Sequence, residues 1–205
     1  MGKRLFDLVV SLLALMLLSP VFLLVAVLVK ISSKGPAFFG QVRVGRNEKP
    51  FTIWKFRSMC CRAEELGPPI TASGDPRITR FGAFLRKSKL DEVPQLWNVL
   101  KGDMSFVGPR PELPCYVVGY STEQRRVFAV KPGITDLASL HYREEERLLT
   151  NSNDPARYYR ATILPHKLAL NVQYIERISL LQDLALILST VRSVLTRKSF
   201  SMNMK

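Results

Sequence analysis

The most pronounced pattern in the chain is an uncharged apolar run near its start, from Leu8 to Val29. A straight helix over these residues would rise about 33 Å, which is enough to cross a hydrocarbon core of about 30 Å. Pro20 interrupts the run near its middle, because it lacks a backbone donor and its ring crowds the carbonyl of Met16. The proline also disfavours helical geometry at Ser19. The pattern therefore predicts a kink or a break at this point.

Basic residues flank the apolar run on both sides: Lys3 and Arg4 before it, and Lys30 and Lys34 after it. The positive-inside preference would keep both ends on the cytoplasmic face. A single straight span satisfies the length but not this charge pattern, whereas a helix that breaks and returns satisfies both. We therefore expect residues 1–35 to form a re-entrant membrane anchor, a helix–break–helix with Ser19 and Pro20 at the break. The Ser19 hydroxyl is expected to bond a carbonyl freed by the kink. A cleaved signal peptide is disfavoured, because no small-residue cleavage site follows the run.

Residues 36–205 are then expected to form one cytoplasmic domain, so the whole chain is expected to be a monotopic, membrane-associated α+β protein that is mostly helical. Two β-rich runs, AFFGQVRVG and PFTIWKFRSM, flank a turn at Gly45–Asn47 and predict a small β-hairpin. The clearest helix spans Asp91–Lys101, with apolar residues at Val93, Leu96, Trp97 and Leu100. An amphipathic C-terminal helix over Tyr174–Lys198 has one apolar face. Packing on the domain and lying in the membrane interface both remain open for that face.

The charge balance indicates an anionic partner. The chain holds 30 lysine and arginine residues against 17 aspartate and glutamate residues, a net charge of +13. Such an excess favours nucleic acid, an anionic substrate or an anionic membrane. The basic residues are scattered among apolar segments rather than gathered on one helix or ribbon, which disfavours nucleic acid. The three cysteines and two histidines lie in no ligand or nucleophile motif, so zinc sites, disulfide frameworks and Ser-His or Cys-His hydrolases are disfavoured too.

Two adjacent acids, Asp91 and Glu92, start the clearest helix, one residue after the basic segment RKSK. Acids in the first turn of a helix ordinarily cap its amides and complement its dipole, and this is one interpretation. In the other, one carboxylate attacks phosphorus while its neighbour binds a metal ion or handles a proton. Neighbouring cations and helix-end amides would keep Asp91 ionised and draw phosphate toward it.

Basic residues in two further segments are candidate phosphate or substrate ligands. Arg110 lies in a Gly-Pro-Arg-Pro sequence, where the prolines restrict the backbone and present a guanidinium fork suited to phosphate. Lys55 and Arg57 alternate with Trp54 and Phe56, so they share one face of a strand. Solvated surface charge is the alternative for these cations. The sequence contains no Walker A loop and no GxGxxG, so phosphate binding would fall to side chains and helix termini.

Taken together and in order, these segments resemble the small monotopic phosphoglycosyl transferases of the bacterial sugar transferase family. The matching blocks are KRLFDLVVSLLALMLLSP, FTIWKFRSM, DPRITRFGAFLRKSKLDEVPQLWNVLKGDMSFVGPRPELP and KPGIT, within residues 3–135. The resemblance implies a re-entrant helix that anchors the catalytic domain on the cytoplasmic face of the bacterial inner membrane. It also implies transfer of a phosphosugar from a UDP-sugar to polyprenyl (undecaprenyl) phosphate with release of UMP, the first membrane step of glycoconjugate and polysaccharide biosynthesis.

The resemblance further implies roles for individual residues. Asp91 is expected to attack the sugar-bearing phosphate and to form an aspartyl-phosphosugar intermediate, with Glu92 as its metal or proton partner. Mg²⁺ is expected at Asp91 and Glu92, and Arg86 and Arg110 are expected to hold phosphates. Asp136 stands where many relatives carry glycine, so residues 136–147 are expected to bear on the choice of sugar.

Two other classes of function stay open on the sequence. One is a membrane-anchored adaptor in which the acids only cap a helix, and the other is a sugar-nucleotide hydrolase in which water replaces the lipid acceptor. Membrane lipids are expected partners of the anchor. The sequence leaves open which sugar is transferred, the length of the polyprenyl chain and whether the protein forms a homodimer.

Overall fold

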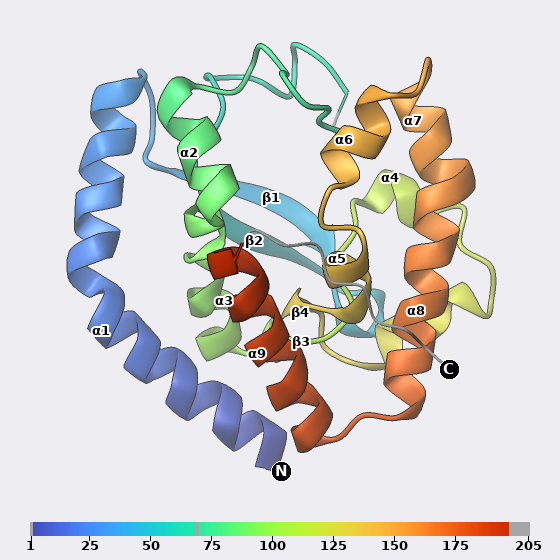
Figure 1. Ribbon diagram of the computed structural model, residues 1–205. Coiled ribbons are helices and arrows are strands. Elements are labelled where there is room, and N and C mark those ends of the chain that lie inside the picture. Colours follow the sequence, from blue (N-terminus) through green and yellow to red (C-terminus); the bar gives the residue numbers. More distant parts are fainter. Residues whose placement is uncertain (1, 69, 197–205) are drawn as a thin grey trace.

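The structure, a computed structural model, describes residues 2–68 and 70–196 and begins with one long helix, α1 (Gly2–Ser32), that contains Pro20. Figure 1 shows that α1 changes direction near its middle. The Ser19 hydroxyl donates to the Met16 carbonyl oxygen at 2.8 Å, as expected. This bond satisfies an acceptor that Pro20 leaves without its usual amide donor. The predicted helix–break–helix is therefore wrong in its detail, because the chain bends at Ser19 and Pro20 within one continuous helix.

Both ends of α1 are fixed to the same body. Near the start of the helix, Arg4 donates to the carbonyl oxygens of Val99 and Leu100 at 2.6 and 2.9 Å. Past its end, Arg57 donates to the carbonyl oxygens of Ser33 and Lys34, each at 2.7 Å. The helix thus lies along one side of the domain (Figure 1), rather than projecting from it by one end.

The two sides of α1 differ in exposure. Toward the domain, Val25 and Val29 pack with Phe56 and Leu85 in one buried cluster. Away from it, twelve large hydrophobic side chains are exposed: Leu5, Val9, Leu12, Leu13, Met16, Leu17, Val21, Leu23, Leu24, Val27, Leu28 and Ile31. Within the described ranges, α1 is the one helix that is long and apolar enough to cross a membrane. Its outer side is a surface of the kind that lipid covers.

The strands form two small sheets. The first is the predicted hairpin of β1 (Phe38–Val44) and β2 (Pro50–Phe56), which are antiparallel and joined by the 3-10 turn η1 (Arg46–Glu48). The second pairs β3 (Ser105–Val107) with β4 (Gly133–Thr135) in parallel. The hairpin prediction is confirmed, and the parallel pair brings the Gly-Pro-Arg-Pro and KPGIT segments side by side.

Most of the remaining elements are short helices. The α-helices between the hairpin and the C-terminal region are α2 (Arg80–Ser88), α3 (Gln95–Lys101), α4 (Pro114–Val117), α5 (Leu137–His141), α6 (Glu145–Thr150) and α7 (Pro155–Tyr158). The 3-10 segments η2 (Leu90–Glu92) and η3 (Gln124–Ala129) and the π-helix η4 (Tyr159–Ile163) complete this part. The helix predicted to begin at Asp91 therefore begins at Gln95, after a separate tight turn that holds the two acids. Leu96 is buried as predicted, whereas Trp97 is largely exposed.

The predicted C-terminal helix is two helices, α8 (Leu164–Glu176) and α9 (Leu180–Thr196), so the single helix from Tyr174 is wrong. Ser179 separates them, because its hydroxyl oxygen accepts the amide of Gln182 at 3.2 Å and caps the second helix. Lys198 lies outside the described residues.

One side of α9 packs on the domain, where Leu186 joins the buried cluster of Val107, Leu140 and Tyr174. Apolar side chains along the rest of the helix are exposed: Leu180, Leu181, Leu184, Leu188 and Val191. The helix therefore packs on the domain and still presents an apolar stripe outward.

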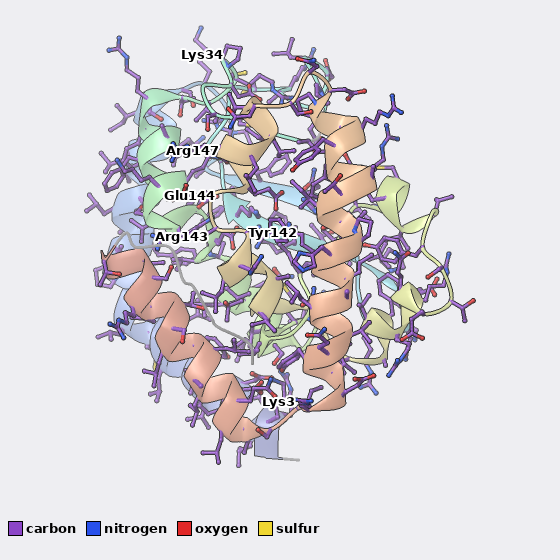
Figure 2. All side chains as sticks on the ribbon, turned by 45° about the vertical axis from the view of Figure 1, so that its right-hand side comes forward. Lys3, Lys34, Tyr142, Arg143, Glu144 and Arg147 are labelled. Carbon is purple, nitrogen blue, oxygen red and sulfur yellow. The ribbon has the colours of Figure 1, made fainter. Side chains whose placement is uncertain are left out.

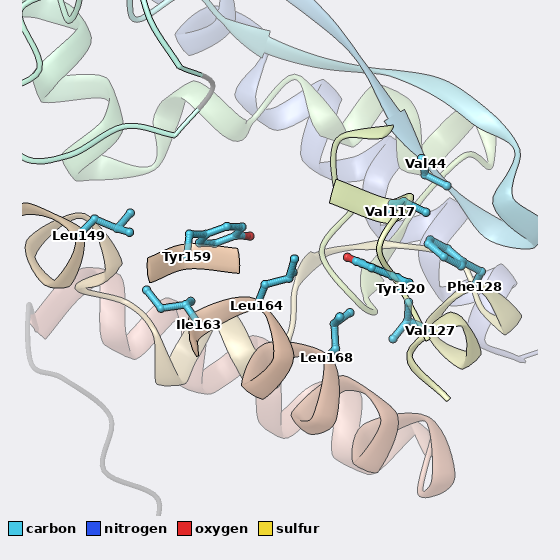
Figure 3. Packing of buried hydrophobic residues seen from close by; sticks show 10 residues of the cluster. All are labelled: Val44, Val117, Tyr120, Val127, Phe128, Leu149, Tyr159, Ile163, Leu164 and Leu168. Atoms are coloured by element: carbon cyan, nitrogen blue, oxygen red, sulfur yellow. The ribbon is translucent and has the colours of Figure 1, made fainter. Parts of the chain in front are cut away.

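The main core lies between α8 and the end of the hairpin. Figure 3 shows its ten buried side chains in a row from Leu149 of α6 to Val44 and Phe128. Tyr159, Ile163, Leu164 and Leu168 form the middle of the row on one continuous helical stretch, and Val117, Tyr120 and Val127 complete it. This core joins the C-terminal half of the chain to the hairpin.

Two glycines allow the parallel strands to meet. A Cβ atom on Gly133 would lie 2.2 Å from the backbone nitrogen of Gly108, and one on Gly108 would lie 2.3 Å from the carbonyl oxygen of Lys131. Because the obstructing atoms belong to the backbone, no side chain can move to make room. The close packing of these segments therefore requires glycine at both positions.

We expect Gly133→Ala to destabilise the protein by about 1–3 kcal/mol or more, because the added methyl group overpacks the contact between β3 and β4. Gly119→Ala is the matched control, since its Cβ would meet no atom nearer than 3.9 Å; a change within about 0.5 kcal/mol is expected there. Thermal unfolding of the detergent-solubilised protein, followed by circular dichroism, measures both. Equal stability of the two variants would contradict the close approach.

Candidate active site

The two adjacent acids lie in η2, the tight turn between α2 and α3. Lys89, with φ 59°, takes a left-handed conformation that ends α2 and starts this turn. Asp91 and Glu92 are both buried, and no side chain caps the start of η2 or of α3 by a hydrogen bond. The interpretation that these acids only cap the following helix is therefore wrong.

Glu92 is held by two cations from distant parts of the chain. Arg110, from the loop after β3, donates through Nη2 to Oε1 at 2.6 Å and through Nη1 to Oε2 at 3.3 Å. Lys55 of β2 places its Nζ 3.3 Å from the same Oε1. Burial alone would raise the pKa of Glu92, but Arg110 and Lys55 outweigh it and hold that pKa well below its ordinary range. Glu92 is thus a paired, ionised carboxylate.

Asp91 has a different environment from its neighbour. Its Oδ1 atom is buried and has no hydrogen-bond partner among the residues that the structure describes. Burial raises the pKa of Asp91, and Lys55 opposes part of that shift. A buried carboxylate oxygen without a partner has a lone pair available for a ligand. The turn therefore holds Glu92, whose two oxygens are paired, and Asp91, whose Oδ1 is unpaired among the described residues. Lys55 lowers the pKa of both acids.

The structure separates the remaining candidate cations. Arg86, near the end of α2, forms an ion pair with Glu146 of α6, which connects the site to the segment after α5. Figure 2 shows that segment, with Arg143, Glu144 and Arg147 labelled, between α2 and α8. Arg57 instead donates to the carbonyl groups that follow α1. Lys55 lies in β2, which ends at Phe56, so Arg57 follows the strand. The two cations thus have different partners, and Arg57 has a structural role at the end of α1.

Two charged residues near the site, Arg43 and Glu112, were not selected from the sequence, and a third, Asp136, was selected only as the start of the segment expected to bear on the choice of sugar. Arg43 of β1 donates to the carbonyl oxygen of Pro111 at 3.1 Å, directly beside Arg110. The carboxylate of Glu112 accepts the hydroxyl of Tyr159 at 2.6 Å. Asp136 is buried and caps α5 by accepting the amide and the hydroxyl of Ser139 at 2.8 and 2.6 Å. For Arg43 a signal was available, since hairpin pairing puts it on the same face as Lys55.

The donor set at Asp91 fits one type of metal ion. Mg²⁺ binds through one or two carboxylates and completes its shell with water and substrate phosphate oxygens. The unpartnered Oδ1 of Asp91 can serve in this way, whereas both oxygens of Glu92 already accept hydrogen bonds. The described residues contain no group of three or more His, Cys, Asp or Glu side chains arranged to hold a metal ion. A metal ion at this turn would therefore depend on oxygens from its substrate.

Comparison with known proteins places the whole arrangement in a family. The family described as bacterial sugar transferase matches residues 1–197. A UDP-glucose:undecaprenyl-phosphate glucose-1-phosphate transferase of Caulobacter vibrioides is 39% identical over 199 residues, which cover 95% of this chain and 70% of that protein. The exopolysaccharide production protein PSS of Rhizobium leguminosarum bv. phaseoli is 40% identical over 206 residues, which cover 95% of this chain and 96% of that protein.

A third relative is longer. A UDP-N-acetylgalactosamine-undecaprenyl-phosphate N-acetylgalactosaminephosphotransferase of Aeromonas hydrophila is 38% identical over 199 residues, and the match spans 95% of this chain but 44% of that protein. The similarity covers the anchor helix, both sheets and the paired acids. This chain therefore belongs to the bacterial sugar transferase family.

Proposed function

We propose that this protein transfers a sugar 1-phosphate from a UDP-sugar to undecaprenyl phosphate, with release of UMP. Relatives of 38 and 39% identity carry names that state such a transfer. The observation that carries the proposal is the pair of unlike acids. Asp91 has a buried oxygen without a partner, while Glu92 beside it accepts hydrogen bonds from Arg110 and lies against Lys55.

In the first step, an oxygen of Asp91 attacks the phosphorus that carries the sugar. A bond forms between that oxygen and phosphorus, and the bond to the bridging oxygen breaks, so that UMP leaves with the electron pair. Arg110 and Lys55 lie beside the acids and would stabilise the charge that develops on the phosphate oxygens. Glu92 would hold both cations in place for this step. Arg86 would contribute a further cation once it exchanges Glu146 for phosphate.

In the second step, a phosphate oxygen of the lipid attacks the phosphorus of the aspartyl-phosphosugar. The acyl phosphate bond breaks, Asp91 regains its carboxylate, and the sugar leaves on a lipid diphosphate. Atoms and charge balance without water or an added proton donor. Mg²⁺ held by Asp91 and by substrate oxygens would screen the repulsion between the carboxylate and the phosphates.

The membrane arrangement is part of the same proposal. A polyprenyl chain leaves a bilayer only at a large hydrophobic cost, so its phosphate has to be met at the headgroup level. Both ends of α1 are bound to one domain, and its outer side is apolar. These features support a re-entrant α1 that enters and leaves the cytoplasmic face of the inner membrane, with the stripe on α9 lying in the interface.

We expect Asp91→Asn to abolish UMP release from UDP-sugars, because an amide is not a nucleophile toward phosphorus. The loss should reach about 10³-fold or more. The measurement is UMP formation from a panel of UDP-sugars with undecaprenyl phosphate and Mg²⁺, together with intact-protein mass analysis after donor alone. The wild-type protein should gain the mass of one phosphosugar, and Asp91→Asn should gain none.

The matched control is Asp103→Asn, since the partly buried Asp103 pairs with Lys101 and accepts a hydrogen bond from Asn98, has no contact with the paired acids among the described residues, and should leave turnover unchanged. Full turnover by Asp91→Asn would refute the assignment of the nucleophile. Release of UMP at the catalytic rate without lipid would favour a hydrolase, and no turnover with any UDP-sugar would favour an adaptor.

The pH dependence should follow the ionisation of Asp91. Burial holds the pKa of Asp91 above its ordinary value of about 3.9, so kcat/KM for UMP release should fall as the pH drops through this raised pKa. Lys55→Gln removes a cation that lowers the Asp91 pKa and should therefore move the acid limb to higher pH. The profile of Lys101→Gln, an exposed lysine outside the site, should match that of the wild-type protein. If the acid limb of the kcat/KM profile kept its position or moved to lower pH in Lys55→Gln, the claim that Lys55 lowers the pKa of Asp91 would be contradicted.

A re-entrant α1 makes a direct topological prediction. In a variant with serine at positions 60, 61 and 115, the substitutions Gly2→Cys and Lys34→Cys should both react with an impermeant maleimide in inverted inner-membrane vesicles. Neither should react in right-side-out vesicles. Labelling of the two positions from opposite sides would rule out the re-entrant arrangement and indicate a single span.

A further inference from the structure

Asp7 is a buried carboxylate at the start of the apolar anchor. It is only 2% exposed, although it lies directly before the run of apolar residues that faces lipid in the proposed arrangement. Its Oδ1 accepts the hydroxyl of Ser105 and the backbone amide of Phe106, each at 3.2 Å. Burying a carboxylate is costly unless such partners are present. Helix formation alone therefore does not explain a buried carboxylate at position 7.

The partners of Asp7 lie on β3, the strand that leads to Arg110. The other edge of this strand is covered by β4, so α1 supplies side-chain partners where a third strand would otherwise lie. Lys3 adds a second contact, because its Nζ donates to the carbonyl oxygen of Val107 at 3.0 Å and forms an ion pair with Asp183 of α9. The first turns of the anchor thus hold every residue of β3.

The chain between β3 and Arg110 has little freedom to absorb a displacement. Gly108 donates its amide to the Thr135 carbonyl oxygen at 3.1 Å, and Pro109 accepts the amide of Gly133 at 3.0 Å. Proline on both sides of Arg110 fixes two further backbone angles. A shift of β3 would consequently be passed to the guanidinium that pairs with Glu92.

From this path we propose that Asp7 is a positioning residue, which acts through β3 to orient the Arg110 guanidinium toward the reacting phosphates. The proposal rests on the proposed function. It adds that the contact between α1 and β3 sets the position of the phosphate-binding Arg110. A residue that only stabilised the fold would lower the amount of active protein in every background alike. A residue that acts through Arg110 loses its effect once the arginine fork is gone.

The test is a double-mutant cycle between Asp7→Ala and Arg110→Lys, measured as kcat and KM for UMP release by purified full-length protein in nanodiscs. Asp7→Ala should lower kcat by roughly tenfold in the wild-type background, because small misplacements of a charged group are costly. In the Arg110→Lys background the same change should cost less than about twofold. Equal losses in both backgrounds would overturn the proposal.

Two further variants separate geometry from folding. Asp7→Asn retains an oxygen that can accept both hydrogen bonds, so it should keep activity within about twofold of the wild-type protein; a loss as large as that of Asp7→Ala would overturn the proposal. Ser11→Ala is the matched control, since Ser11 is equally buried in α1 but bonds only to Leu8 of the same helix. It should leave kcat and KM unchanged.

A readout without turnover distinguishes this proposal from the proposed function. Amide hydrogen exchange over residues 105–111 should accelerate at least tenfold in Asp7→Ala and remain unchanged in Ser11→Ala. Unchanged exchange in Asp7→Ala would refute the mechanical link. If the wild-type protein released no UMP from any UDP-sugar, the proposed function would fail, whereas the exchange result would still decide whether α1 fixes β3.

Discussion

The ion pair between the buried Glu92 and the partly buried Arg110 is the interaction on which the site depends. It joins a tight turn after α2 to the loop after β3, and Lys55 brings in the hairpin as the third segment. Two adjacent carboxylates cannot share one set of cations equally. Glu92 pairs with the Arg110 guanidinium and its pKa is lowered, while Oδ1 of Asp91 has no hydrogen-bond partner among the described residues and the pKa of Asp91 is raised. Environments that push the pKa values of two like groups apart give the groups different chemical roles. Because Glu92 is paired with the cations, Oδ1 of Asp91 stays available for a ligand.

A second constraint comes from the anchor. Backbone groups inside a bilayer have to be satisfied within the protein, and α1 remains one helix with the Ser19 hydroxyl on a carbonyl that Pro20 would leave open. Hydrogen bonds from side chains hold its two ends, in addition to the packing of Val25 and Val29 on the domain. Arg4 bonds the end of α3, and Arg57 bonds the residues after α1. These contacts hold the first and the last turn of α1 to the same domain as the paired acids, so in the proposed arrangement membrane attachment and the geometry of the site are coupled.

The local sequence pattern predicted the secondary-structure elements better than the side-chain contacts between them. The apolar run, the hairpin, the acids at 91 and 92 and Arg110 followed from periodicity, proline and charge, and the resemblance added Arg86. Alternation predicted one strand face for Lys55 and Arg57, but β2 ends at Phe56, and the pattern could not show that Lys55 pairs with Glu92 while Arg57 bonds the carbonyls after α1. The same limit applies to Asp7, Arg43 and Glu146, whose partners lie far away along the chain. The break in the C-terminal helix depended on one serine cap, which a continuous apolar period concealed.

The contact between Arg86 and Glu146 has a consequence for ligand exchange. An arginine that already holds a carboxylate does not present a bare charge, so an arriving anion replaces one partner with another. Glu146 is about half exposed, and returning its carboxylate to water costs little. The net free energy gained when an anion binds Arg86 is then the small difference between its attraction to the anion and its attraction to Glu146. Such a hold is easily reversed, which fits the proposed two-step transfer, in which UMP leaves before the lipid phosphate reacts.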